Sequence, residues 1–196
     1  MTQANTSGPV VPGHENTMPK LIPVPIETKG KGFFKALWIW IKSTREWKFE
    51  SDWDFYLPDI DKTMVIPKDF VFDGASVPKR LRAYLSPVGL LLVPGIIHDY
   101  GYRYDYIWVR KSDGSVEKEY LDAGRKHWDD IFFKVGNHVN GVFVINFLAT
   151  FALALAGWIA WKNNRKKTFP PLEPETLNMT SWTEIITAEA EEPATV

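Results

Sequence analysis

The pattern of apolar and polar positions divides the chain into a strand-rich part, a helical part and one long apolar run. Between residues 46 and 72, short segments rich in aromatic and β-branched side chains are separated by turns that contain Pro or Asp. Such segments are typical of antiparallel strands. We therefore expect an α+β fold, in which a small antiparallel sheet precedes packed helices that carry the candidate chemistry.

A helix is predicted after the loop at residues 111–115, beginning near Ser115 or Val116. Its apolar positions recur at helical spacing, and they are Leu121, Gly124, Trp128, Ile131, Phe132 and Val135. Asp129 lies at the edge of this stripe, where it can face a partner helix and stay partly solvated. Asp130, one residue later, is expected to point to solvent.

Residues 142–161 form the long apolar run, in which Asn146 and Thr150 are the only polar side chains. About 20 apolar residues can span a bilayer, and the four basic residues within 162–167 are typical of a cytoplasmic flank. The alternative is a helix buried in the domain or in a homo-oligomer, with a basic end that suits its dipole. We favour a membrane anchor.

These patterns suggest four regions. Residues 1–32 are rich in Pro, Thr, Gly and Asn and are expected to be a flexible tail. Residues 33–140 form the globular domain, opening on a short apolar segment that either packs or lies at an interface. Residues 141–167 are the anchor and its flank, and residues 168–196 are an acidic, unstructured tail.

Composition narrows the partners and the compartment. The 196-residue chain has a net charge of −1 and shows no nucleic-acid-binding motif, so no nucleic acid partner is expected. It has no Cys, which excludes disulfides and thiolate metal sites. The first 18 residues lack a basic start followed by an apolar run, so we expect no cleavable signal peptide.

The densest group of candidate chemical residues lies within residues 94–106, PGIIHDYGYRYDY. In a helix, His98 and Tyr102 share one face, and Asp99 stands beside them. This arrangement suits a general base next to a metal ligand. In the alternative, Asp99 pairs with Arg103 and His98 is a core histidine satisfied by a backbone carbonyl.

Residues 73–78, DGASVP, are expected to form a tight turn that closes a strand, because Asp, Gly, Ser and Pro favour turns. The alternative is that Asp73 and nearby backbone carbonyls supply oxygen ligands to a hard cation.

Three motifs in this order resemble a family of phage and prophage proteins, numbered 1353 among the domains of unknown function. The resemblance covers about residues 45–140. Its matching residues are Asp73, Ala75, Ser76, Val77, Pro78, His98, Asp99, Tyr102, Arg103, Arg125, Asp129 and Phe132. Trp128 stands where the family usually has a small residue, and the family implies no activity.

The segment HDYGYR is also similar to the active-site helix of prokaryotic phospholipases A2. That resemblance implies that His98 is the general base, Asp99 a Ca²⁺ ligand and Asp129 the acid that orients the imidazole, with Tyr102 supporting the network. Asp73 would add an oxygen ligand. The chain departs from those enzymes in lacking their cysteines and their glycine-rich calcium loop.

Two functions follow as the main expectations, beside an interaction module whose acidic tail recruits a basic partner. The first is a phage-type hydrolase of membrane lipid esters, held at the host inner membrane or in the virion. The second is a non-enzymatic, membrane-anchored or virion-associated protein that contacts phage structural proteins, with the His-Asp motif as a structural network.

Overall fold

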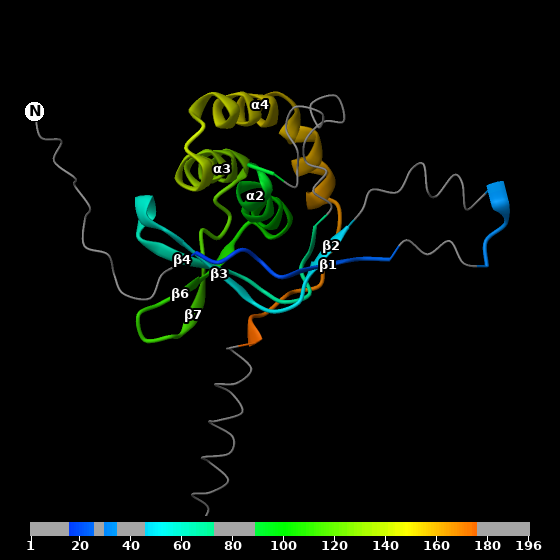
Figure 1. Cartoon of the computed structure of the whole chain (residues 1–196), viewed down its shortest axis with the longest axis horizontal. Coiled ribbons are helices and arrows are strands. Elements are labelled where there is room, and N and C mark those ends of the chain that lie inside the picture. Colours follow the sequence, from blue (N-terminus) through cyan, green and yellow to red (C-terminus); the bar gives the residue numbers. More distant parts are fainter. Residues whose placement is uncertain (1–15, 26–29, 35–45, 73–88, 176–196) are drawn as a thin grey trace, which may run out of the picture.

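The computed structural model describes residues 16–25, 30–34, 46–72 and 89–175. Within these ranges the chain forms two small antiparallel sheets and a group of helices, which confirms the α+β class (Figure 1). Residues 73–78, with Asp73, lie outside the described residues, as does most of the apolar segment after residue 33.

The first sheet has the order β1-β2-β5 and is antiparallel throughout. Its strands are β1 (Leu21–Pro23), β2 (Trp47–Phe49) and β5 (Val71–Phe72). Strand β1 comes from the region for which the sequence predicts a flexible tail. Phe49 and Phe72 are buried and pack on each other with ring centroids 6.0 Å apart, so this sheet contributes an aromatic side to the core.

The second sheet has the order β3-β4-β6-β7. Its strands are β3 (Trp53–Leu57), β4 (Lys62–Ile66), β6 (Ile107–Arg110) and β7 (Val116–Glu119). The short 3-10 helix η1 (Pro58–Ile60) connects β3 to β4. The strands between residues 46 and 72 are therefore antiparallel as predicted, but they are divided between two sheets.

The helix expected to begin near Ser115 begins ten residues later, because Val116–Glu119 is a strand. Strand β7 pairs with β6 along its whole length, from Ile107 opposite Glu119 to Arg110 opposite Val116. Helix α3 (Arg125–Asn140) follows Gly124, whose φ of +81° is a conformation that glycine adopts at little cost. Hairpin pairing with β6 thus decides the structure of a segment whose own sequence has little strand character.

Three helices cover one side of the strands (Figure 1). Helix α2 (Leu92–Tyr104) contacts β6 and lies nearest the sheets, α3 packs on α2, and α4 (Phe143–Arg165) packs on both from farther out. Pro94 falls in the first turn of α2, where its missing N–H costs no helical hydrogen bond. The core between α2 and the strands is aromatic and aliphatic, with Phe70, Ile97 and Tyr100 fully buried.

Helix α4 coincides with the apolar run but is not one straight span. Its parts Phe143–Leu155 and Gly157–Arg165 meet at an angle of 55°. Among the described residues, no single helix has the length and apolar composition to cross a membrane, and only these two parts taken together meet both requirements. The expected single membrane-spanning helix is therefore not found.

The residues that follow α4 return to the domain. The indole N–H of Trp108 donates to the carbonyl of Leu172 at 3.0 Å, and the Tyr104 hydroxyl donates to the carbonyl of Pro170 at 3.2 Å. The first residues of the expected acidic tail thus lie against the sheet and the end of α2.

Candidate functional site

Helix α2 places His98 and Tyr102 on one face, as their spacing predicts. The centroids of the two rings are 3.9 Å apart, and both side chains are buried. Phe132 of α3 meets the imidazole edge-on at 5.5 Å. The imidazole is therefore held between a phenol of its own helix and a ring of the next one.

Asp129 of α3 reaches this pair from across the helix interface. Its Oδ1 lies 3.1 Å from Nε2 of His98 and accepts a 2.5 Å hydrogen bond from the Tyr102 hydroxyl. Its Oδ2 accepts a 2.9 Å hydrogen bond from Arg125, one helical turn earlier. Asp129 is only 5% exposed, whereas we expected it to stay partly solvated; Asp130 is exposed, as predicted.

The two imidazole nitrogens of His98 have different surroundings. Nε2 faces Asp129, so the neutral ring carries its proton there and donates it to the carboxylate. Nδ1 is buried and has no hydrogen-bond partner among the described residues. Asp99 Oδ1 lies 3.9 Å from Nδ1, beyond hydrogen-bond length. In the neutral imidazole, Nδ1 is thus a buried acceptor that lies on the side of the ring away from Asp129.

The surrounding groups also set the protonation of the site. Burial by itself lowers the pKa of the His98 imidazole, but the hydrogen bond to Asp129 and the negative charges of Asp129 and Asp99 outweigh it and raise the pKa above its ordinary value. Burial, followed by the hydrogen bond to Asp129, raises the pKa of the Tyr102 phenol. Tyr102 therefore remains a neutral donor, while His98 can hold a proton near neutral pH.

Close packing fixes the distance between α2 and α3. Trp128 is fully buried against Gly101, where a Cβ atom would lie 2.2 Å from the indole. The Trp128 indole N–H donates to Oδ1 of Asp105, which also accepts from the backbone N–H of Gly124. A glycine and a tryptophan thus allow the close approach that brings Asp129 to His98.

Asp105 and Arg165 have roles at the end of α2 that the sequence pattern does not predict. Asp105 ends α2 in a left-handed conformation, with φ of 56°, and is buried. Arg165, interpreted as part of a membrane flank, donates to the carbonyls of Tyr102 and Arg103 at 2.8 and 2.6 Å. It therefore caps the end of α2. For Asp105, the local signal in the sequence was its position directly after the helical segment, where aspartate often adopts positive φ.

Calcium has an incomplete set of ligands here. Asp99 is adjacent to His98 and buried, but the described residues contain no group of three His, Cys, Asp or Glu side chains that could hold a metal. Asp73, the other expected ligand, lies outside the described residues. Of the two expected calcium ligands, Asp99 is the one that lies within the described residues. Arg103, the alternative partner considered for Asp99, places its guanidinium over the rings of Phe70 and Phe169.

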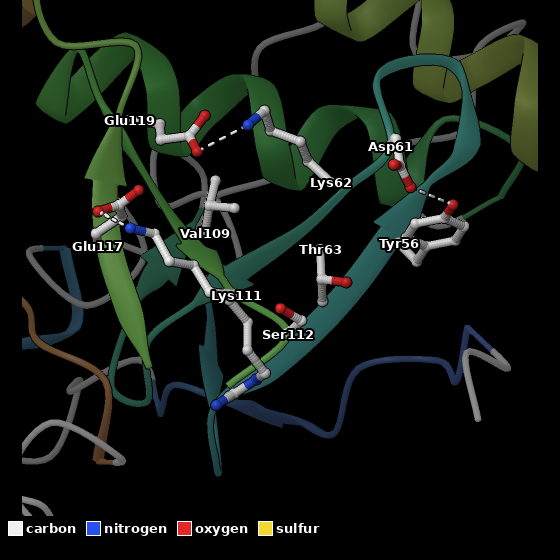
Figure 2. A pocket seen from close by; sticks show the side chains of 10 residues that line it. Tyr56, Asp61, Lys62, Thr63, Val109, Lys111, Ser112, Glu117 and Glu119 are labelled. Carbon is white, nitrogen blue, oxygen red and sulfur yellow. Dashed lines mark hydrogen bonds and ion pairs between the residues drawn. The ribbon is translucent and has the colours of Figure 1, made fainter. Parts of the chain in front are cut away.

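A concave surface of about 500 Å³ lies elsewhere, over the second sheet (Figure 2). Two of its lysines pair with two of its glutamates, Lys62 with Glu119 at 2.8 Å and Lys111 with Glu117 at 2.5 Å. The Tyr56 hydroxyl donates to Asp61 at 2.8 Å. None of the candidate catalytic residues lines this hollow.

The fold and the site define a small α+β protein with a buried His-Asp pair shared between two adjacent helices. The chain belongs to the family described as "Protein of unknown function (DUF1353)", whose model matches residues 47–146. This confirms the family resemblance and includes both helices of the pair. No curated protein and no solved structure gave a significant match.

Proposed function

We propose that the protein is a hydrolase of membrane lipid esters in which His98 is the general base. The observation that carries this proposal is the asymmetry of the imidazole, with Nε2 bound by Asp129 and Nδ1 left without a hydrogen-bond partner among the described residues. A buried acceptor without a partner costs about 1–3 kcal/mol. Such a cost is understandable where the acceptor is kept for a reacting water.

In the proposed reaction, Nδ1 takes a proton from a water molecule as the water oxygen attacks the ester carbonyl carbon. The imidazolium is stabilised by Asp129, which Tyr102 and Arg125 hold in place. When the tetrahedral intermediate collapses, Nδ1 returns the proton to the leaving alkoxide, and a carboxylic acid and an alcohol result. Because His98 is 1% exposed, substrate binding requires a displacement that uncovers Nδ1.

The proposal also includes a Ca²⁺ ion at the site and a location at a membrane. We propose Asp99 as a Ca²⁺ ligand, with Asp73 as a second one, in keeping with the similarity to phospholipases A2. The proposed setting is a phage protein at the host inner membrane or in the virion. The support for a membrane is the exposed apolar side of α4, on which Phe147 and Phe151 are about half exposed.

The experiment is release of fatty acid from mixed phospholipid vesicles by the purified full-length protein, with Ca²⁺ and with chelator. Vesicles with ester-linked and ether-linked chains are compared, because only the former can be hydrolysed. We expect Ca²⁺-dependent release from the ester lipids alone. Absence of release under every condition, from protein shown to be folded, would reject the hydrolase.

The burial of His98 favours a second candidate function, a non-enzymatic virion or membrane protein in which the network joins α2 to α3. Asp129 accepts from donors on both helices, which suits a structural connection. In that case His98→Ala lowers the free energy of unfolding by roughly 1–3 kcal/mol, since Asp129 loses a buried donor. A folded, equally stable and inactive variant would instead indicate a catalytic role.

A further inference from the structure

Helix α4 presents an apolar face to solvent along nearly its whole length. The side chains of this outer face are 49–63% exposed, and they include Phe143, Phe147, Phe151, Leu155, Trp158 and Ile159. The rings of Phe143, Phe147 and Phe151 stack in series, with centroid distances of 6.1 and 6.5 Å. A continuous apolar surface of this kind on a folded domain marks an interaction site.

The opposite face of α4 is fixed to the domain by buried polar contacts. Asn146 is fully buried and donates to the side-chain oxygens of Asn137 and Asn140, both at 2.9 Å. At the other end of the helix, Arg165 donates to the end of α2. Separating α4 from the domain to span a membrane would leave these groups without partners. Only the outer face is therefore free to contact lipid.

The charges at one end of the outer face identify its partner. No acidic residue occurs between residues 142 and 167, while Lys162, Lys166 and Lys167 are exposed at the C-terminal end of α4. The ammonium of Lys162 lies 5.2 Å from the ring centroid of Trp158, which is itself half exposed. Tryptophan beside lysine is typical of the zone where lipid headgroups meet acyl chains.

We propose that the outer face of α4 is an in-plane membrane-binding surface that inserts its aromatic and aliphatic side chains into a bilayer containing anionic lipid. A second copy of the same face would bring no opposite charge to the lysines, whereas anionic headgroups would. In Figure 1, the first part of α4 forms the end of the molecule opposite β7, and its second part turns toward the sheets. Phe143–Leu155 can therefore lie flat on a membrane while the sheets point away from it. This surface does not depend on any role of His98.

Flotation of the full-length protein with vesicles tests the binding. We expect binding to vesicles of phosphatidylcholine and phosphatidylglycerol, weaker binding to phosphatidylcholine alone, and release by salt. The double variant Phe147→Glu/Phe151→Glu should bind at least tenfold more weakly. Leu121→Glu is the matched control because Leu121 is 63% exposed and lies outside α4, between β7 and α3. Circular dichroism verifies that each variant is folded.

A second set of variants tests whether the lysines at the end of α4 contribute to binding. Lys166→Gln/Lys167→Gln should weaken binding to the anionic vesicles and reduce its salt dependence, whereas Lys118→Gln on β7 should change neither. Failure of the wild type to bind either vesicle would overturn the proposal. If the wild type also forms a dimer that Phe147→Glu/Phe151→Glu disrupts, the face would instead be assigned to a second copy of the chain.

The depth of insertion distinguishes an in-plane helix from a spanning one. The chain has no Cys, so Phe147→Cys and Leu155→Cys can each be spin-labelled singly. Both positions lie in the same straight part of α4, about 12 Å apart along the helix axis. An in-plane helix predicts nearly equal label depths in the bilayer. Depths that differ by about 10 Å or more would overturn the proposal in favour of a spanning helix.

Discussion

The Tyr102 hydroxyl donates a 2.5 Å hydrogen bond to Oδ1 of Asp129, the same oxygen that lies 3.1 Å from Nε2 of His98. One carboxylate oxygen thus faces two donors from α2, while the other faces Arg125 of α3. This arrangement fixes the carboxylate in two directions. It also determines the orientation of the imidazole, because Nε2 is directed to a carboxylate that cannot easily rotate.

Replacing Tyr102 by Phe removes one of these donors and keeps the ring. We expect the free energy of unfolding to fall by about 0.5–1.5 kcal/mol, the usual net contribution of a hydrogen bond. Turnover should fall only severalfold, because Arg125 still holds Asp129. Chemical denaturation and initial rates measure the two effects. Tyr120→Phe, on a ring that packs against His127 instead, is the control. Unchanged stability and rate in Tyr102→Phe would show that the hydroxyl is dispensable.

Two glycines of α2 should respond oppositely to substitution by alanine. At Gly101 the new Cβ would lie 2.2 Å from the Trp128 indole, so α2 and α3 must separate. We expect a loss of about 1–3 kcal/mol or more in the free energy of unfolding. At Gly95 no neighbouring atom lies within 4 Å of the new Cβ, and alanine should stabilise the helix by about 0.5–1 kcal/mol.

Thermal or chemical unfolding of these two variants measures both effects. An equal response of the two would contradict the close packing of Trp128 on Gly101. In a hydrolase, Gly101→Ala should also lower the rate, because it moves Asp129 away from His98, whereas Gly95→Ala should leave the rate unchanged.

The raised pKa of His98 predicts how stability depends on pH. The folded protein binds the proton more tightly than the unfolded chain does, where the pKa is near 6.5. The resulting stabilisation is fully present below about pH 6.5 and is lost as the pH rises through the folded-state pKa. In chelator, denaturant unfolding should therefore give a higher free energy of unfolding for the wild type than for His98→Asn. This difference should shrink as the pH rises.

The rate should change with pH in the opposite direction, because a general base must be neutral to accept a proton. Turnover is expected to rise as the pH passes the raised pKa of His98. Over the same pH range, the difference in the free energy of unfolding between the wild type and His98→Asn should fall. If this difference in the free energy of unfolding grew between pH 6 and 8, Asp129 and Asp99 would not be stabilising the protonated form of His98.

The sequence predicted the α+β class, the strands between residues 46 and 72, and the meeting of His98 with Tyr102. These follow from local spacing, which determines the face a side chain occupies. The position of Asp129 on a helix facing its partner could also be predicted, because it lies beside an apolar stripe with a clear helical period.

Other features depend on contacts with other elements of the fold. Val116 is the only apolar residue of β7, so its strand is formed by pairing with β6 rather than by local preference. Arg165 follows an apolar run and resembles a membrane flank, yet it donates to the end of α2. Asp105 is important because Trp128 reaches it from α3. The local signals are limited to the turn residues Asp113 and Gly114 between β6 and β7, and to the position of Asp105 directly after the helical segment.

The role of His98 as the base of an ester hydrolase is tested by the initial rate of fatty acid release by His98→Ala. His127→Ala is the matched control, because His127 is a partly buried histidine of α3 outside the pair. We predict that His98→Ala, folded by circular dichroism, loses at least about 10²-fold in rate while His127→Ala keeps the wild-type rate. Wild-type turnover that persists in folded His98→Ala would contradict the account.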